Sequence, residues 1–217
     1  MKEEKNIGYL RKSYEKGSLN DDKKAMHPVD LFKDWFDAAE AHPDVEEANA
    51  MSIATLGLDG FPKARVVLLK QFSSEGFVFY TNYKSQKGLA IEVHDKVGLT
   101  FFWPAMERQI LIKGIAQKVS AQTSDAYFYS RPKGSQIGAI VSPQSQPIED
   151  RSFLEKRLDS LETQFKKENP KRPAHWGGYL VVPKTIEFWQ GRPNRLHDRM
   201  EFSLNKKNKW TAVRLAP

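Results

Sequence analysis

Hydrophobic residues first recur at helical spacing after a polar stretch at the start of the chain. Residues 1–27 carry charges of both signs with little periodicity, which predicts a flexible N-terminal arm. The next segment, PVDLFKDWFDAAEAH, places its apolar side chains on one helical face: Leu31, Phe32, Trp35, Phe36 and Ala39. Pro28 stands at its start and Pro43 just past its end, so we expect an amphipathic helix here.

Short runs rich in β-branched and aromatic residues follow between positions 50 and 120. They are AMSIATL, KARVVLLKQ, GFVFYTN, VGLTFFW and RQILIKGIAQKV. Turn residues separate them at 57–62, 73–76 and Pro104. Strands at this spacing predict a meander that closes into a barrel. Between the third and fourth runs, SQKGLAIEVHD has room for a short helix.

The second half of the chain begins with helical patterns and ends with strands. Helices are predicted in SDAYFYSRP, GSQIGAIVS and DRSFLEKRLDSLETQFKKE, and strands in GGYLVVP, TIEFWQ, MEFSL and WTAVRL. No internal repeat interrupts this order. The expected fold is therefore mainly β with flanking helices, formed as one domain by residues 28–217.

Charge and composition narrow the possible partners. The 34 Lys and Arg against 27 Asp and Glu give a formal charge of +7, which suits nucleic acid, acidic membranes or small phosphorylated ligands, although solubility alone explains many such surpluses. There is no cysteine, and the five histidines lack zinc-site spacing, so no metal is expected. A charged N-terminus and the lack of a long apolar run predict a cytoplasmic protein that does not enter membranes.

No glycine-rich phosphate loop of the Rossmann or P-loop type occurs in the sequence. A bound phosphate would have to be held by side chains, and cations embedded in apolar segments are the candidates because a buried charge needs a partner. In RVVLLK, Arg65 and Lys70 bracket four aliphatic residues. Residues five apart face opposite sides of a regular strand, so one shared ligand requires a bulge or a strand end. Alternatively, both ends emerge into water.

Two further segments combine cations with hydroxyl or aromatic groups. In YTNYKSQK, Ser85 precedes a predicted helix and Lys84 and Lys87 flank it, which suits an anion, although such a serine is often only a cap. In SDAYFYSRP, Tyr127 and Arg131 share one helical face, an arrangement that by itself is usually structural.

The segment RLHDR is the third cationic candidate. If it is extended, Arg195, His197 and Arg199 share one face, which suits a planar anionic ligand. Trp189 and Gln190 stand just before it and could meet a flat heteroaromatic ring. The alternative is an exposed loop whose aspartate pairs with its neighbours.

Taken together, these segments resemble the pyridoxamine 5′-phosphate oxidase family. The resemblance runs in consistent order through LRKSYEKG, RVVLLK, FYTNYKSQK, ERQ, YFYSRPKGSQIGA, SPQS, EFWQG, RLHDR and the terminal RLAP, which covers nearly the whole chain. The combination of EFWQG with RLHDR is the most specific part. The resemblance implies an FMN-binding split β-barrel that works as a homodimer, with each flavin held between the two subunits.

The resemblance also implies roles for particular residues. FMN contacts would come from Arg65, Val66, Lys70, Tyr80, Thr81, Gln86, Lys87, Gln109, Gln144, Ser145, Trp189 and Arg199. The substrate would be bound by Lys70, Tyr127, Arg131, Ser135, Arg195 and His197, with Arg11 and Tyr14 of the arm covering the site. Where family members commonly have Ser-Arg-Lys, this chain has Ser85-Gln86-Lys87, a departure that bears on flavin affinity and not on flavin identity.

The activity implied is oxidation of pyridoxine or pyridoxamine 5′-phosphate to pyridoxal 5′-phosphate, with O₂ as electron acceptor and H₂O₂ as by-product. Arg195 and His197 would be catalytic: they orient the pyridine ring and assist the proton that leaves the C4′ substituent as a hydride passes to the flavin. Two phosphates per site would explain the embedded cations without nucleic acid. The alternatives are a nicotinamide-dependent flavin reductase, a protein that stores pyridoxal phosphate, and a single-stranded nucleic-acid binder.

Overall fold

The structure is a computed structural model that describes residues 5–217. Its contacts divide the chain into two compact units. The first unit comprises Met1–Ala48, Phe101–Leu111 and Thr185–Pro217, and the second comprises Asn49–Thr100 and Ile112–Lys184. Residues 5–27 of the predicted arm therefore belong to the first unit; the flexibility of this arm and the single-domain organisation of residues 28–217 stay predictions.

The first unit contains a helix that the sequence predicts almost to the residue. Helix α1 (Pro28–Glu40) has proline in its first turn, and the His27 side chain caps it by accepting from the Val29 amide. Its apolar face is buried by aromatic contacts, with Phe32 against Phe101 and Trp35 against Phe188 at centroid distances of 5.1 and 5.2 Å. The unit also contains η1 (Asp21–Ala25), η2 (Pro104–Met106), η3 (Pro193–Arg195), β8 (Asp198–Leu204) and β9 (Trp210–Leu215).

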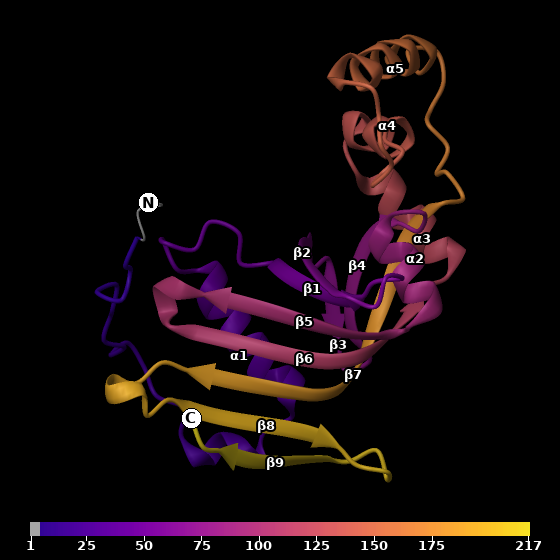
Figure 1. Cartoon of the computed structure of the whole chain (residues 1–217). Helices are drawn as coiled ribbons and strands as arrows, with labels where there is room; N and C mark the ends of the chain where they lie inside the picture. The colour runs from indigo at the N-terminus through magenta and orange to yellow at the C-terminus, as the bar shows by residue number, and fades with distance from the viewer. Residues whose placement is uncertain (1–4) are drawn as a thin grey trace. The chain divides into compact units, whose positions relative to one another are not determined.

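The second unit combines antiparallel strands with helices. Its elements are β1 (Ala50–Leu56), β2 (Pro62–Leu68), β3 (Gln71–Ser73), β4 (Gly76–Asn82), α2 (Gln86–Val93), α3 (Ala121–Ser130), α4 (Lys133–Val141) and α5 (Arg151–Gln164). Helices α4 and α5 lie side by side (Figure 1), where Ile137, Val141 and Phe165 form a small apolar cluster. Leu154, Leu158 and Leu161 of α5 pack against this cluster, so they form an apolar stripe on that helix.

Three long strands contribute residues to both units: β5 (Lys96–Trp103), β6 (Arg108–Lys118) and β7 (Trp176–Gln190). The order of hydrogen-bonded strands is β2-β1-β5-β6-β7-β4-β3, with β8 paired to β7 and to β9 (Figure 1). The mainly β fold with flanking helices is thus confirmed. The simple meander is wrong, because β5 pairs with β1 and β4 pairs with β7 rather than with each other. The short helix predicted between β4 and β5 is present as α2.

Two strand boundaries also differ from the prediction. The runs GGYLVVP and TIEFWQ form one strand, β7, whose first part pairs with β4 and whose last part pairs with β8. Pro183 lies between the residues that pair with β4 and those that pair with β8. Conversely, residues 63–71 divide into β2 and β3, because the amides of Leu69 and Lys70 bond to Asn49 and Val78.

Across residues 5–217, the structure contains neither a helix suited in length and apolarity to crossing a membrane nor a group of three His, Asp or Glu residues placed to hold a metal ion.

Candidate functional site

A cavity of about 460 Å³ opens in the second unit among β2, β4, α2, α3 and α4. We call it the stacked cavity, after the aromatic rings beside it. Its polar lining residues are Lys70, Tyr80, Thr81, Asn82, Lys87, Tyr127, Arg131, Ser135, Ser142, Gln144 and Trp176. No carboxylate lines it, so the cations carry their charge into the cavity uncompensated by acidic side chains. Its volume is in the range of small-molecule sites.

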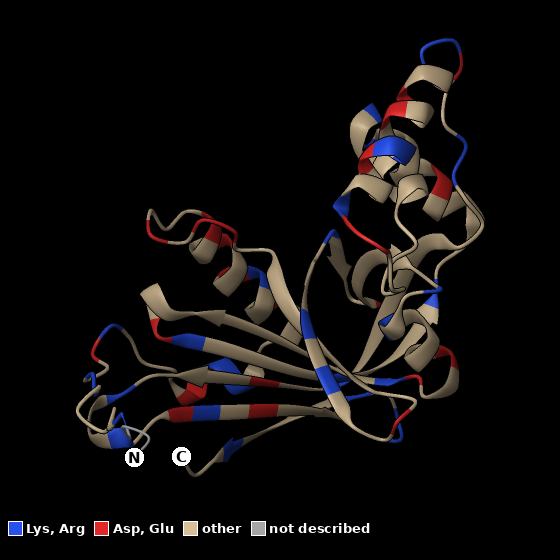
Figure 2. Cartoon of the chain, turned by 45° about the horizontal axis from the view of Figure 1, so that its top comes forward, with Lys and Arg blue, Asp and Glu red and all other residues tan. Residues whose placement is uncertain are grey.

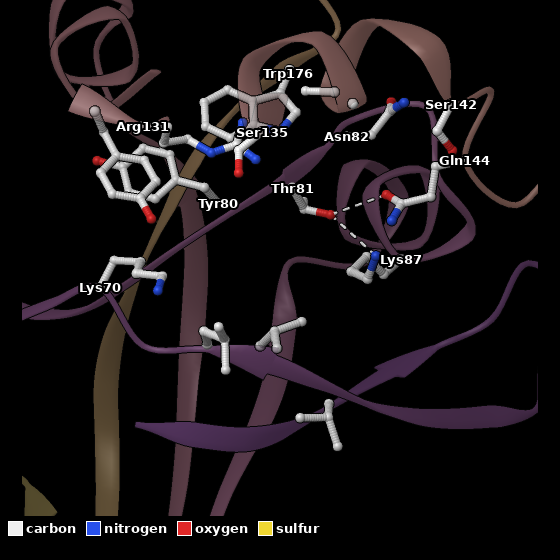
Figure 3. Close-up of a pocket in the computed structure, with 16 residues that line it drawn as sticks. Lys70, Tyr80, Thr81, Asn82, Lys87, Arg131, Ser135, Ser142, Gln144 and Trp176 are labelled. Atoms are coloured by element: carbon white, nitrogen blue, oxygen red, sulfur yellow. Dashed lines mark hydrogen bonds between the residues drawn. The ribbon is translucent and has the colours of Figure 1, made fainter. Parts of the chain in front are cut away.

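One end of the stacked cavity is built around Lys87 (Figure 3). This side chain is only 8% exposed, and its ammonium group lies 3.1 Å from Thr81 Oγ1 and 3.4 Å from Ser85 Oγ. Thr81 Oγ1 in turn lies 3.5 Å from Gln144 Oε1. Burial, followed by the nearby charge of Arg65, lowers the pKa of Lys87. An anion bound here would pair with the ammonium group and so offset the free-energy cost of burying its charge.

Ser85 positions this lysine. Its hydroxyl caps α2 by accepting from the Gly88 amide and donates to the carbonyl of Asn82. The capping interpretation of this serine therefore holds, and the cap places Lys87 in the first turn of the helix.

The other end of the stacked cavity is aromatic and cationic. The rings of Tyr80 and Tyr127 stack with centroids 3.9 Å apart, and Trp176 stacks on Tyr80 at 5.5 Å. The Arg131 guanidinium lies over Trp176, 4.7 Å from the ring centroid, and its Nη1 is buried without a hydrogen-bond partner. Burial lowers the pKa of Arg131. Figure 3 shows Lys70 and Ser135 near this end.

Arg131 fits a phosphate for a specific reason. Its Nη1 is buried and lacks an acceptor, which is destabilising. Phosphate oxygens can accept from a guanidinium in a bidentate manner. Arg131 follows α3 as its C-cap, four positions after Tyr127, so the structure brings both predicted side chains to the cavity.

A second cavity, of about 780 Å³, lies in the first unit, and we call it the arm cavity. It is lined by Leu10, Arg11, Lys12, Ser13, Tyr14, Arg192, Asn194, Arg195 and His197, again without a carboxylate. The Tyr14 ring meets Trp189 and His197 edge-on at 5.7 Å. The structure thus brings together the predicted arm residues and the predicted catalytic pair, with Trp189 behind them.

The RLHDR segment is not extended throughout, which corrects the expected common face. Asn194 and Arg195 adopt left-handed conformations with φ of 57° and 62°, and only Asp198 onward belongs to β8. Arg195 and His197 consequently line the arm cavity, whereas Arg199 does not. Arg199 makes two hydrogen bonds, of 2.8 and 3.1 Å, to the carboxylate of Glu187, and this hydrogen bonding raises the pKa of Arg199.

Neighbouring residues complete the account of RLHDR. Asp198 pairs with Arg214 at 2.8 Å, as expected if its role is structural. The buried Gln190 amide is fully used: it donates to the carbonyls of Met106 and Glu107 and accepts from Arg108. It is therefore not available to a ligand ring.

Of the remaining predicted residues, two line the stacked cavity and the others do not. Arg65 and Gln86 line a smaller cavity of about 210 Å³ in the second unit, and Arg65 donates to Thr55 Oγ1 at 2.7 Å. Val66 lines the stacked cavity. Gln109 lies in β6, and Ser145 has a left-handed φ of 70° beside the lining residue Gln144. Lys70, past the end of β2, lines the stacked cavity and Arg65 does not, so the structure does not bring these two cations to one cavity.

Several lining residues carried no usable signal in the sequence. Trp176 has no charged neighbour that would mark it, yet it holds the ring stack and Arg131. Asn82 and Ser142 line the stacked cavity because of the tertiary fold, and no local sequence pattern marks them. Lys12 and Arg192 in the arm cavity could have been found by extending the cationic pattern outward from Arg11 and Arg195.

A mainly β chain whose buried or clustered cations line cavities without carboxylates is, by class, a binder of small phosphorylated ligands. Two family models match the chain and are consistent with this class. Residues 38–165 match the model for pyridoxamine 5′-phosphate oxidase. Residues 176–217 match the model for the pyridoxine 5′-phosphate oxidase C-terminal dimerisation region. The chain belongs to the pyridoxamine 5′-phosphate oxidase family.

Relatives and solved structures extend the match over the whole chain. The chain is 55% identical to a pyridoxine/pyridoxamine 5′-phosphate oxidase of Flavobacterium johnsoniae, over 97% of this chain and 98% of that protein. It is 50% identical to one of Bordetella petrii, over 97% and 99%. The crystal structure of PhzG from Burkholderia lata has a TM-score of 0.84 and 26% identity, covering 90% of this chain and 95% of that one.

Proposed function

We propose that this protein is an FMN-dependent oxidase that converts pyridoxine and pyridoxamine 5′-phosphate to pyridoxal 5′-phosphate, with O₂ as acceptor and H₂O₂ as by-product. The observation that carries the proposal is the stacked cavity, which has one cation at each end: the buried Lys87 and the half-buried Arg131, whose Nη1 is buried (Figure 3). Two separate cation sites suit two separate phosphates, one from the flavin and one from the substrate.

The Lys87 end is assigned to the FMN phosphate. Lys87 and Thr81 would hold its oxygens, with Gln144 beside them, and the lowered pKa of Lys87 reflects a charge that the cofactor would neutralise. When bound, FMN supplies hydride acceptance and reoxidation by O₂. Gln86 is exposed and shares the smaller cavity with Arg65, so it would contribute at most from the rim.

The Arg131 end is assigned to the substrate phosphate, together with Lys70, Tyr127 and Ser135. Arg195 and His197 of the arm cavity would complete the substrate-binding site. We infer a homodimer in which FMN lies at the subunit interface, supported by the match of residues 176–217 to a dimerisation region. In that dimer, three residues of the first unit would contact the flavin: Gln109, Trp189 and Arg199.

The tautomer of His197 defines what this residue can do. The amide of Arg192 donates to His197 Nδ1 at 3.1 Å, so the neutral ring carries its proton on Nε2 and offers a donor there. Arg195 is permanently charged and is also a donor. Both side chains would therefore orient the pyridine ring and stabilise negative charge on the C4′ oxygen as its proton leaves to water.

The rival functions fit these observations less well. In a nicotinamide-dependent flavin reductase, the pyrophosphate of the nicotinamide dinucleotide is an internal bridge between two ribosyl groups, whereas the buried Nη1 of Arg131, which lacks a partner, suits a terminal phosphate. For single-stranded nucleic acid, a continuous basic face is expected; Figure 2 instead shows acidic segments interspersed with the basic ones. A protein that only stores pyridoxal phosphate is separated from an oxidase by turnover.

The proposal is tested by the absorption spectrum of the purified protein. We expect a yellow protein with bound FMN that bleaches when pyridoxine 5′-phosphate is added without oxygen. Readmitting air should restore the colour and release H₂O₂ and pyridoxal 5′-phosphate in equal amounts. A protein that cannot be reconstituted with FMN would refute the proposal, and a coloured protein that never bleaches would indicate storage or reductase chemistry.

Substituting Arg195→Ala should impair oxidation far more than flavin binding. Arg195 lines the arm cavity and is exposed, so its loss should not unfold the chain. A charged hydrogen bond contributes about 1.5–3 kcal/mol, so kcat/KM should fall about tenfold or more while the Kd for FMN stays within about twofold. Steady-state kinetics and flavin titration measure the two effects separately. Full activity would show that Arg195 does not meet the substrate.

A further inference from the structure

We propose that Glu107 is a positioning residue: its buried carboxylate fixes the N-terminal arm in the register that brings Tyr14 to the substrate. The inference rests on the proposed oxidase function, which assigns Tyr14 and the arm cavity to the substrate. Glu107 itself lines neither cavity and would act only through the arm.

Glu107 is an unusual residue for a buried position. It is 2% exposed and has a left-handed φ of 57°, just past η2. A buried carboxylate is strongly destabilising unless it is satisfied by donors. Its Oε2 accepts from the backbone amides of Glu15 at 2.7 Å and Lys16 at 2.9 Å, so the arm supplies both donors.

The nearby cation, Lys12, does little to stabilise the buried Glu107 carboxylate. Lys12 Nζ lies 3.8 Å from Glu107 Oε1, and its side chain is 63% exposed, so this pair contributes little. The two short hydrogen bonds from backbone amides therefore contribute most to stabilising the Glu107 carboxylate. Backbone amides cannot rotate away as side chains can, and two consecutive amides on one oxygen define which arm residues lie at this place in the first unit.

Glycines at the seat of the arm support the same interpretation. A Cβ on Gly191 would lie 2.8 Å from Tyr14 Cβ and 3.0 Å from Glu107 Cβ, so the absent side chain is what allows Tyr14 to approach. A Cβ on Gly17 would lie 2.8 Å from Gln190 Oε1. Arg192 donates to the carbonyl of Gly17 at 2.8 Å, which secures the arm on the other side of Glu15 and Lys16.

The consequence for function is the position of Tyr14. With the arm seated, its ring packs edge-on against Trp189 and His197 and forms part of the wall of the arm cavity. A slip of one residue would present Ser13 or Glu15 instead. Glu107 would thus determine whether the arm offers an aromatic or an acidic side chain to an anionic substrate.

The test compares four variants of the full-length holoenzyme. Glu107→Leu keeps the bulk but leaves two partly buried amides without an acceptor, and Glu107→Gln keeps one acceptor oxygen. Gly191→Ala keeps the carboxylate but crowds both Tyr14 and the Glu107 Cβ. Glu15→Gln is the matched control, because it removes an acidic side chain from the arm and leaves its amide in place.

Two kinds of measurement distinguish positioning from general stability. Cleavage by trypsin after Lys12 and Lys16, with hydrogen exchange of the Glu15 and Lys16 amides, reports whether the arm is seated; both should speed up about tenfold or more in Glu107→Leu. The KM for pyridoxine 5′-phosphate should rise by a similar factor, with FMN affinity within about twofold. Glu107→Gln should lie between wild type and Glu107→Leu, Gly191→Ala should raise KM, and Glu15→Gln should change nothing.

A double-mutant comparison completes the experiment. In a Tyr14→Ala background, Glu107→Leu should add no further rise in KM, because the residue through which it acts is gone. Unchanged cleavage and exchange in Glu107→Leu would overturn the proposal, and so would faster cleavage with an unchanged KM. If Glu107→Leu does not fold, Glu107→Gln and Gly191→Ala decide it. If the wild type fails to oxidise the substrate, the oxidase proposal fails. The role of Glu107 in seating the arm is then still tested by trypsin cleavage, hydrogen exchange and the Kd for pyridoxal 5′-phosphate.

Discussion

Replacing Lys87 with methionine should weaken FMN binding by about 30- to 150-fold, because the variant loses a charge-assisted contact of about 2–3 kcal/mol in a buried site. Lys87 is 8% exposed, and its ammonium group faces Thr81 and Ser85 within hydrogen-bond distance. Methionine keeps the length and fills the space. Flavin titration of the apoprotein, followed by fluorescence, gives the change in Kd.

The same substitution should stabilise the apoprotein. Burial lowers the pKa of Lys87 below 10.5, so the folded apoprotein disfavours its charged form relative to the unfolded chain. Between the lowered pKa and 10.5 the unfolded chain binds more protons, so the stability of the apoprotein should rise with pH in that window and be lowest below it. Lys87→Met removes this dependence, and its apoprotein should melt at a higher temperature despite binding FMN less tightly.

FMN affinity should have the opposite pH dependence. The phosphate prefers the ammonium form, so binding to the wild type should weaken as pH rises past the lowered pKa of Lys87, and Lys87→Met should lack that decline. Lys84→Met is the control: Lys84 is an exposed lysine of the same loop that does not line the stacked cavity. If Lys84→Met weakens FMN as much as Lys87→Met does, the phosphate lies elsewhere on this loop.

Local sequence patterns predict the elements of this fold well and their connections poorly. Helix α1 and strands β1 and β4 agree with the sequence because proline, capping residues and alternation act within a few positions. The pairing of β4 with β7 depends on contacts about 100 residues apart in the chain, which no local pattern encodes. The continuity of β7 through Pro183 was missed because a proline between two runs normally ends a strand.

The candidate site divides in the same way. Lys87 and Arg131 could be assigned to the site only through the family resemblance, because each segment by itself also has a structural explanation, a helix cap or a helix face. The common face expected for Arg195, His197 and Arg199 failed because left-handed residues at 194 and 195 turn the chain and Glu187 takes Arg199. Trp176 and Glu107 could not be predicted, since their partners, Arg131 in one case and the arm amides in the other, are distant in sequence.

Replacing Arg131 with methionine should lower kcat/KM for pyridoxine 5′-phosphate by about 100-fold, mainly by raising KM. The buried Nη1 of Arg131 has no hydrogen-bond partner, so a substrate phosphate would gain a desolvated, charge-assisted contact there. Oxidation of unphosphorylated pyridoxine, assayed at high concentration, should change by less than about threefold, because that compound never uses the contact. The ratio of the two kcat/KM values therefore measures phosphate recognition directly.

Lys133→Met provides the matched control for Arg131→Met. Lys133 is exposed, begins α4 two positions later, and bonds only to the carbonyl of Glu168 at 3.4 Å, so its loss should leave both substrates unaffected. FMN affinity should stay within about twofold in Arg131→Met, since the flavin phosphate is assigned to Lys87 at the other end of the stacked cavity. If Arg131→Met instead released FMN and slowed both substrates equally, the two phosphates would have been assigned to the wrong ends.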